Sequence, residues 1–206
     1  MNFIDRLKNF VDTQLGGFFF TRTYDEEIRI FRAKFGPQFK DYDELVSAAS
    51  FVFVNSNPYL DYPRPTLHKT IQIGGITVAV DPKTNELSKE WDSILNKRNT
   101  TVLVSFGSVA KSIYMPQEYR KTLLEVFESM PETTFIWKYE EEGSTIAKHL
   151  RNVYLSTWVP QNALLADPRL TVFITHGGLG SVTELAHFGK PAILGSLLYY
   201  IDNVVE

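Results

Sequence analysis

The residues best suited to chemistry lie in a glycine-rich loop, His176-Gly177-Gly178-Leu179-Gly180-Ser181. An apolar strand pattern precedes the loop and a helical pattern follows it. Glycines let a backbone approach a ligand closely, and the free amides at the start of a helix attract an anion. His176 can add a hydrogen bond or a charge, and Ser181 a hydroxyl group. The loop therefore indicates a phosphate or diphosphate site, and a tight turn with a packed histidine is an equally good explanation.

Three further side chains are of types that bind nucleotides. Glu184 falls at about the second turn of the following helix, where a carboxylate can accept hydrogen bonds from a ribose diol; an exposed helix residue is the simpler explanation. Trp158, in Trp158-Val159-Pro160-Gln161, offers a flat face for a base, and Gln161 a donor and an acceptor for its edge. An isolated tryptophan more often covers the core. Ser108, which ends an earlier strand, can donate to a phosphate.

The same loop contains a near-match to the dinucleotide-binding fingerprint. Gly178, Gly180 and Thr183 form G-x-G-x-x-T. The third glycine, which allows close packing of helix and strand, is missing, and the later acid Asp202 does not clearly end a strand. A nicotinamide-dependent oxidoreductase is therefore a weak alternative.

Composition and spacing exclude several kinds of site. The 206 residues contain no cysteine, which excludes disulfides and thiolate chemistry, and the net charge of −3 offers no basic field for nucleic acid. The four histidines lack metal-ligand spacing, and no D-x-D-type acidic pair ends a strand to hold a divalent ion, so we expect no metal. The sequence shows neither a signal-peptide core nor an apolar run of about 18 residues that could span a bilayer.

Alternating strands and helices would position these residues. β-branched and apolar runs predict strands at 101–106, 133–139, 153–157, 171–175 and 191–194. Pro116 is expected as the first residue of the helix that follows the first of them. This alternation is typical of an α/β fold with a parallel sheet and helices on both faces. Ligands bind at the carboxyl ends of such strands, which selects the loops 107–108, 140–144, 157–161 and 176–181.

The chain before residue 80 has a different pattern. Apolar residues at helical spacing predict two helices within residues 2–35, the second ended by Gly36-Pro37. A short helix capped by Asp41 or Asp43 is expected to reach Ala49, and strands are expected at 51–54 and 70–73. Residues 80–90 have the composition of a linker, which predicts a domain boundary, and a helix is expected at 86–97.

The order of these residues resembles a known family. The sequence is similar to the signature of UDP-glycosyltransferases, most closely the animal UDP-glucuronosyltransferase branch, at Trp158-x-Pro-Gln161, Asn162-x-Leu164-Leu165, Phe173-x-Thr175-His176-Gly177-Gly178, Glu184 and Gly189-x-Pro191. Ser105-Phe106-Gly107-Ser108 resembles the S-x-G-S turn of that family. The resemblance covers nearly the whole chain up to about Leu194.

The resemblance implies a GT-B fold, in which two Rossmann-like domains enclose a cleft. Residues 1–82 would be the C-terminal part of the acceptor-binding domain, and residues 83–206 the N-terminal two-thirds of the UDP-sugar-binding domain. Trp158 would stack on uracil and Glu184 would hold the ribose, while His176 would meet the diphosphate. The implied nucleotide-sugar site comprises Ser108, Trp158, Val159, Gln161, His176, Gly178, Gly180, Ser181 and Glu184, with no metal and no cofactor besides the UDP-sugar co-substrate.

The implied activity is transfer of a hexosyl group, such as glucuronic acid, from a UDP-sugar to a small lipophilic acceptor. The family's catalytic histidine and its aspartate partner find no counterpart here, and Tyr200-Ile201 stand where a sugar-gripping Asp-Gln pair is expected. We therefore expect an inactive fragment of such an enzyme. The alternative is a non-catalytic UDP-binding or regulatory module that associates with a full-length family member. For the full-length family, the resemblance implies the lumenal side of the endoplasmic reticulum membrane and homo- or hetero-oligomers.

Overall fold

The computed structural model describes residues 2–78 and 85–195. The chain divides into two compact units. The first runs through Val54 and includes Pro65–Ile71, and the second comprises Asn55–Arg64 and the chain from Gln72 onward. The domain boundary expected between residues 82 and 83 lies outside the described residues and stays a prediction. The positions of Tyr200, Ile201 and Asp202 also lie outside them.

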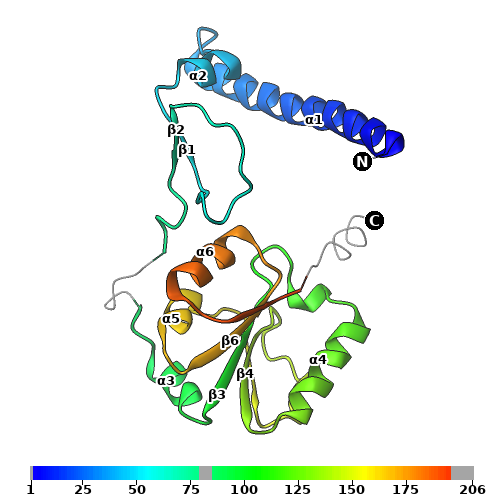
Figure 1. Cartoon of the computed structure of the whole chain (residues 1–206), viewed down its shortest axis with the longest axis vertical. Helices are drawn as coiled ribbons and strands as arrows, with labels where there is room; N and C mark the ends of the chain where they lie inside the picture. The colour runs from blue at the N-terminus through cyan, green and yellow to red at the C-terminus, as the bar shows by residue number, and fades with distance from the viewer. Residues whose placement is uncertain (1, 79–84, 196–206) are drawn as a thin grey trace. The chain divides into compact units, whose positions relative to one another are not determined.

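The first unit begins with one long helix, α1 (Phe3–Phe35), where two helices were predicted (Figure 1). A reciprocal cap starts it, since the Asn2 side chain accepts from the Asp5 amide at 2.8 Å and the Asp5 carboxylate accepts from the Asn2 amide at 3.1 Å. Gly16 and Gly17 each cost about 1 kcal/mol inside a helix, which is too little to interrupt this one. Gly36, at a φ of +103°, ends the helix as predicted.

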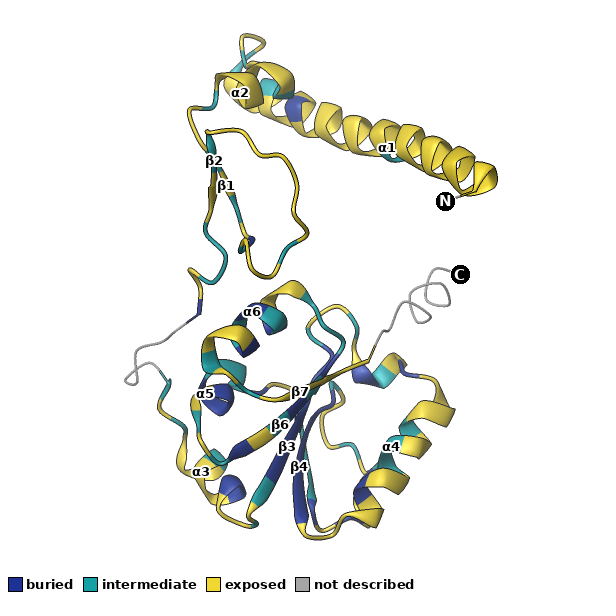
Figure 2. Ribbon diagram, in the orientation of Figure 1, coloured by how far each residue is buried: buried dark blue, intermediate teal, exposed yellow. Residues whose placement is uncertain are grey.

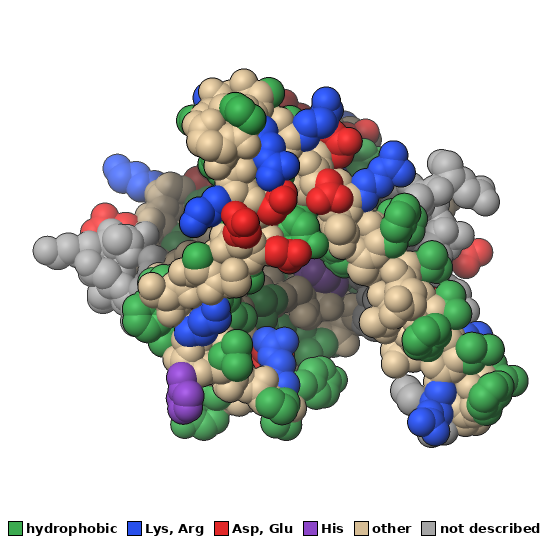
Figure 3. All heavy atoms as spheres, turned by 90° about the horizontal axis from the view of Figure 1, so that it is seen from above, with side chains coloured by type: hydrophobic (Ala, Val, Ile, Leu, Met, Phe, Trp, Pro, Cys, Tyr) green, Lys and Arg blue, Asp and Glu red, His purple; other side chains and the backbone are tan. Residues whose placement is uncertain are grey.

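Nearly all of α1 lies at the surface. Ile28 is its one buried residue, and large apolar side chains such as Phe3, Phe10 and Phe18 are more than half exposed (Figure 2). The face drawn in Figure 3 shows hydrophobic side chains exposed among charged ones. Among the described helices, none combines the length and the apolar character that crossing a bilayer requires.

A short helix and a strand pair complete the first part of the chain. The helix α2 (Tyr42–Ala48) has Asp41 as its N-cap residue, one of the two predicted, although the Asp41 side chain makes no capping hydrogen bond. The strands β1 (Val52–Val54) and β2 (Thr70–Gln72) form a two-stranded sheet. Both strands fall within the ranges predicted for them.

The second unit is built on a parallel sheet whose five strands lie in the order β5-β4-β3-β6-β7. They are β3 (Thr100–Val104), β4 (Thr133–Lys138), β5 (Val153–Ser156), β6 (Leu170–Thr175) and β7 (Ala192–Leu194). Each predicted strand is present within two residues of its expected ends. Because all the strands are parallel, their carboxyl ends meet at one edge of the sheet.

Helices cover both faces of this sheet (Figure 1). One face carries α4 (Gln117–Ser129), and the other carries α3 (Lys89–Leu95), α5 (Gln161–Ala166) and α6 (Leu179–Phe188). Alternate residues of β3 serve the two faces, since Val102 and Val104 share a core cluster with Phe127 of α4, and Leu103 belongs to the cluster of Leu164 and Leu185. Burial on both faces explains why these strands are nearly continuous apolar runs. The predicted α/β architecture is therefore confirmed.

Two helix starts differ from prediction. The helix expected at 86–97 is confined to α3, because Ser88 acts as its N-cap and accepts from the Trp91 amide. Pro116 is the N-cap of α4 rather than its first helical residue. A short 3-10 turn, η2 (Ser112–Tyr114), immediately precedes Met115 and Pro116 and brings the chain from β3 to α4.

Candidate functional site

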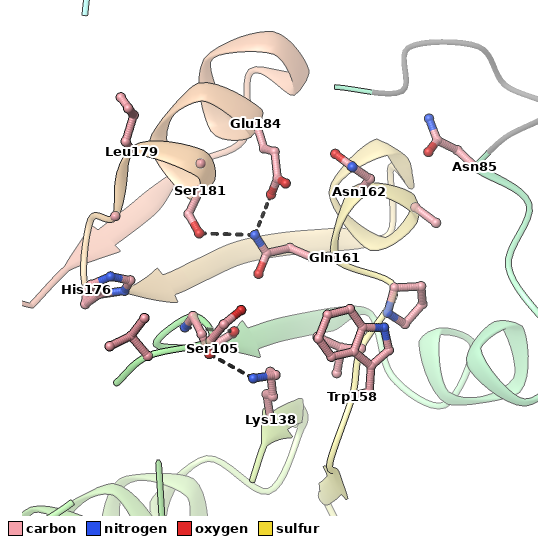
Figure 4. A pocket seen from close by; sticks show the side chains of 18 residues that line it. Asn85, Ser105, Lys138, Trp158, Gln161, Asn162, His176, Leu179, Ser181 and Glu184 are labelled. Carbon is pink, nitrogen blue, oxygen red and sulfur yellow. Dashed lines mark hydrogen bonds between the residues drawn. The ribbon is translucent and has the colours of Figure 1, made fainter. Parts of the chain in front are cut away.

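The carboxyl ends of the strands surround a cavity of about 630 Å³ (Figure 4). Its walls come from the loops after β3, β5 and β6 and from the first turns of α5 and α6. The loop predicted at 140–144 does not line it, and β4 contributes Lys138 instead. All of the predicted site residues line the cavity: Ser108, Trp158, Val159, Gln161, His176, Gly178, Gly180, Ser181 and Glu184. That this cavity binds a nucleotide sugar stays a prediction.

A hydrogen-bonded cluster joins the two helices beside the cavity. Gln161 is the first residue of α5, while Ser181 and Glu184 lie on one face of α6 because they are three residues apart. Gln161 Nε2 donates to Ser181 Oγ at 3.1 Å and also to Glu184 Oε2 (Figure 4). The cluster therefore fixes three polar side chains at the cavity wall, where amide, hydroxyl and carboxylate oxygens can meet a ligand with hydroxyl groups.

Glu184 is half-buried rather than exposed, so its interpretation as a solvated helix residue is wrong. Burial raises the pKa of its carboxyl group, and the hydrogen bond from Gln161 opposes that rise. A carboxylate held in partly dry surroundings by one donor accepts further hydrogen bonds readily. Glu184 thus suits a ligand that brings its own O–H donors.

His176 is held between two stretches of glycine backbone. A Cβ on Gly107 would lie 2.9 Å from His176 Cε1, and one on Gly178 would lie 2.6 Å from His176 Nε2. Gly107 also adopts a φ of +87°, which other residues rarely take. Burial lowers the pKa of His176, so the ring is neutral at pH 7. Its Nδ1 is buried and has no hydrogen-bond partner in the part of the chain that the structure describes.

Beside His176, the helix α6 begins with amides that have no hydrogen-bond partner within the helix. Gly178 is the N-cap and supplies no capping side chain, and the Val182 amide makes the first helical hydrogen bond, to the Gly178 carbonyl at 3.0 Å. The amides of Leu179, Gly180 and Ser181 precede that bond and so have no partner within the helix. The helix dipole adds partial positive charge at this end. Together these groups are of the kind that bind an anion.

Trp158 presents an aromatic face at the end of the labelled site opposite His176 (Figure 4). Trp158 is 70% exposed, whereas the neighbouring Val159 is 4% exposed and packs in the core. Ser156 Oγ donates to the Trp158 carbonyl at 2.6 Å and helps to fix the turn. Trp158 therefore does not cover the core, and its ring is open to stacking on a flat ligand.

Some lining residues were not predicted. Lys138 ends β4 and is buried, and the signal for it was a lysine closing an otherwise apolar strand pattern. Asn162 lines the cavity with a buried Oδ1 that has no hydrogen-bond partner within the described chain. Asn85 comes from a segment distant in sequence, where no pattern marks it. Ser108, which was predicted, is exposed at the rim.

The cavity wall offers groups for an organic anion. Hydroxyl, amide and imidazole groups, with helix amides, line it. Among the residues with described positions, no three His, Cys, Asp or Glu side chains gather as a metal ion would require. The expectation of a metal-free reaction is not tested by this arrangement and stays a prediction.

Comparison with known proteins identifies the family. The model of the UDP-glucuronosyl and UDP-glucosyl transferases matches residues 1–200. A Caenorhabditis briggsae protein named as a UDP-glucuronosyltransferase, ugt-47, is 33% identical over 168 residues, which are 80% of this chain and 31% of that protein. UDP-glucosyltransferase 2 of Dactylopius coccus is 30% identical over 184 residues, which are 89% of this chain and 34% of that protein. The chain thus spans about a third of the length of these curated relatives.

Solved structures of glycosyltransferases share the fold. The glycotransferase of kitacinnamycin superposes with a TM-score of 0.59 at 19% identity, over 93% of this chain and 47% of that one. A UDP-glucosyltransferase from Polygonum tinctorium capable of glucosylating indoxyl gives 0.54 at 21% identity, over 71% of this chain and 35% of that one. The predicted GT-B type of Rossmann-like sheet is therefore confirmed. Worm and insect proteins are among the relatives, as expected for the animal branch. The chain belongs to the UDP-glucuronosyl and UDP-glucosyl transferase family.

Proposed function

We propose that the cavity binds the UDP part of a UDP-sugar, for transfer of the hexosyl group to a small lipophilic acceptor. The supporting observation is the order of groups across the site in Figure 4. Trp158 lies at one end, the Gln161 cluster with Glu184 lies next to it, and His176 lies at the other end. This is the order in which a nucleotide presents its base, its ribose and its phosphates.

Each group suits its share of the nucleotide. The Trp158 ring stacks on uracil, and the Glu184 carboxylate accepts from the ribose hydroxyls. The neutral His176 ring and the first amides of α6 donate to the diphosphate. As the glycosidic bond to UDP breaks, negative charge grows on the departing phosphate, and donors already aimed at it stabilise that charge without reorganising.

The groups around the cavity favour recognition over acceptor activation. His176 is held between the Gly107 and Gly178 backbones, and Glu184 is hydrogen-bonded to Gln161. The proposal assigns both side chains to the nucleotide, which leaves neither to take a proton from the acceptor. We therefore expect UDP binding but no turnover when this chain is mixed with UDP-glucuronate and a phenolic acceptor.

Calorimetric titration of the purified chain with UDP tests the proposal. We expect a single site for UDP and no heat from NADH, which the glycine pattern alone would have allowed. Fluorescence transfer from tryptophan to bound NADH provides an independent check. Binding of NADH without binding of UDP would refute the assignment of the cavity to a uridine nucleotide.

A further inference from the structure

We propose that Lys138 binds the donor directly, by placing its ammonium group against the diphosphate. The inference rests on the proposed function, because it concerns the same cavity and the same nucleotide. It assigns the positive charge that the groups described so far do not supply. Glu140 has the role of a positioning residue that holds the ammonium group in place.

Lys138 is a buried lysine at the carboxyl end of β4 (Figure 4). Its side chain is 7% exposed, and that of Glu140 is 12% exposed. Lysine is almost never buried without a partner, and here Nζ donates to Glu140 Oε1 at 3.0 Å and to the Gly107 carbonyl at 2.8 Å. An ammonium group has three N–H donors. One of them therefore has no hydrogen-bond partner among the described residues, and Lys138 lines the cavity.

Positive charge is scarce around this cavity. Of the described residues that line it, Lys138 is the only lysine or arginine. His176 is neutral at pH 7, because burial lowers its pKa, and Glu184 adds negative charge. The amides of α6 contribute about half an elementary charge through the helix dipole. A diphosphate that leaves water for this site needs positive charge beside it, and Lys138, which is paired with Glu140, is the lining side chain that carries such a charge.

The position of the ammonium group fits the proposed place of the phosphates. Its hydrogen bond to the Gly107 carbonyl sets it beside the glycine that packs against His176. It also lies 5.7 Å from the centre of the Trp158 ring. The charge thus lies beside the Gly107 carbonyl and over the Trp158 ring, within reach of a diphosphate whose uracil stacks on the open part of that ring.

Glu140 holds Lys138 from outside the cavity lining. Its Oε1 accepts from Lys138, and its Oε2 accepts from the Ser112 amide at 2.7 Å. Ser112 Oγ in turn donates to the Lys138 carbonyl at 2.7 Å. Because Glu140 is fixed on both oxygens, the ammonium group keeps one position before the nucleotide arrives. Such preorganisation lowers the cost of binding an anion.

A purely structural role makes a different prediction. If Lys138 served only to hold the Gly107 loop, its loss would loosen the cavity and weaken every ligand. A buried ion pair by itself contributes little net stability, which makes the structural role a poor reason for burying two charges. Uridine separates the two roles, because it carries the base and the ribose but no phosphate.

The experiment compares UDP and uridine affinities by calorimetry. The variants are Lys138→Gln, Glu140→Gln and the double variant, which removes both charges and leaves no buried ion unpaired. Lys148→Gln is the control, because Lys148 is exposed and does not line the cavity. Loss of a charge-assisted hydrogen bond should raise the Kd for UDP about tenfold or more in both variants that lack Lys138, and change that for uridine less than about twofold. Glu140→Gln should keep UDP binding within about threefold of the unchanged chain.

The outcomes separate this inference from the function on which it rests. Equal weakening of UDP and uridine in the double variant, with an unchanged circular dichroism spectrum, would show a structural role and overturn the inference. UDP binding that survives Lys138→Gln would overturn it as well, while leaving the proposed function intact. Failure of the unchanged chain to bind UDP would overturn both at once.

Discussion

Trp158 and Val159 are neighbours with opposite surroundings. Val159 is buried in the core cluster that includes Leu164, while the Trp158 ring beside it is largely exposed. The buried valine anchors the turn after β5, so the tryptophan is held outward, with the Lys138 ammonium group over its ring. Exposing a large aromatic ring costs the free chain hydrophobic stabilisation. A ligand that covers the ring recovers part of it.

Replacing Trp158 with alanine should weaken UDP binding by about 1–3 kcal/mol, the usual loss for a base that stacks on an aromatic ring. Trp158→Phe should retain part of the affinity, since a smaller ring still stacks. Calorimetry of the three proteins would measure the difference. An affinity unchanged in the alanine variant would contradict the stacking role.

Glu184 should couple stability to pH. Its pKa is raised above the unfolded value of 4.5 by burial, so the native chain holds the proton more tightly than the unfolded chain. The stability from this proton is fully present below the unfolded pKa and is lost as pH rises through the native pKa. Relative to the unchanged chain, Glu184→Gln should therefore gain stability between acidic and neutral pH, and UDP affinity should fall if the carboxylate holds the ribose.

Urea unfolding of both proteins from about pH 4 to pH 7 would measure this effect. The difference in unfolding free energy should grow with pH and then level off once Glu184 is ionised in both states. A difference that stays constant across that range would mean that the carboxyl group titrates alike in the folded and the unfolded chain.

The residues of the site were predictable where their types are unusual for their positions. Glycines around a histidine and a Trp-x-Pro-Gln turn are both visible in the sequence. Lys138 was not predicted as a site residue, because a lysine at a strand end is most often exposed and only the fold shows that this one is buried. The hydrogen bond between Gln161 and Glu184 also depends on how α5 and α6 pack, which spacing does not specify.

At the scale of elements, the start of α6 determines the shape of the cavity beside His176. The turn from β6 into the helix passes His176 so closely that only glycine fits at Gly178. Gly180, two residues later and already inside the helix, has nothing within 4 Å of an added Cβ. The two glycines of the G-x-G pattern therefore have different surroundings: close packing against His176 requires a glycine at Gly178 but not at Gly180.

This difference predicts opposite effects on stability. Gly178→Ala should destabilise the unliganded chain by about 1–3 kcal/mol, because the methyl group would displace the His176 ring. Gly180→Ala should stabilise it by up to about 1 kcal/mol, because alanine favours the helix. Thermal unfolding of both variants without nucleotide would measure the effects. Equal destabilisation by the two substitutions would show that close packing against His176 is not what requires a glycine at Gly178.

The strands were predictable because burial on both faces makes them continuous apolar runs, a pattern that does not depend on neighbours. The length of α1 was not predictable, because helix propensity alone makes Gly16-Gly17 a plausible break between two helices. The helix continues through it, with a capping box at Asn2 and Asp5 and a glycine stop at Gly36. Local signals in the sequence therefore predict both ends of α1 correctly, but the break predicted in its middle is absent.

At the scale of the whole molecule, the stabilising contacts are uneven. The parallel sheet has a core on each face, whereas α1 extends for 33 residues with only Ile28 buried. A helix that buries so little depends on propensity and capping, which are marginal in water without packing. Its amides should therefore open more often than those of the sheet.

Hydrogen exchange measured by mass spectrometry would test this. Amides of α1 before Ile28 should exchange faster by several orders of magnitude than those of β3 and β4 in the same sample. The sheet provides the internal control, since both segments experience the same solvent. Comparable protection in α1 and β3 would show that α1 is packed in solution against something that covers its apolar side chains.

The strand order has a consequence for synthesis on the ribosome. Val102 of β3 pairs with Phe135 and also with Val172, which is made much later. Pairing between strands so distant in sequence is slow. A nascent chain can dock β4 on β3 early, but the cavity has no far wall until β6 and α6 have emerged. On the proposed function, UDP would bind only molecules whose sheet is already complete, and its expected effect is to slow their unfolding rather than to hasten their folding.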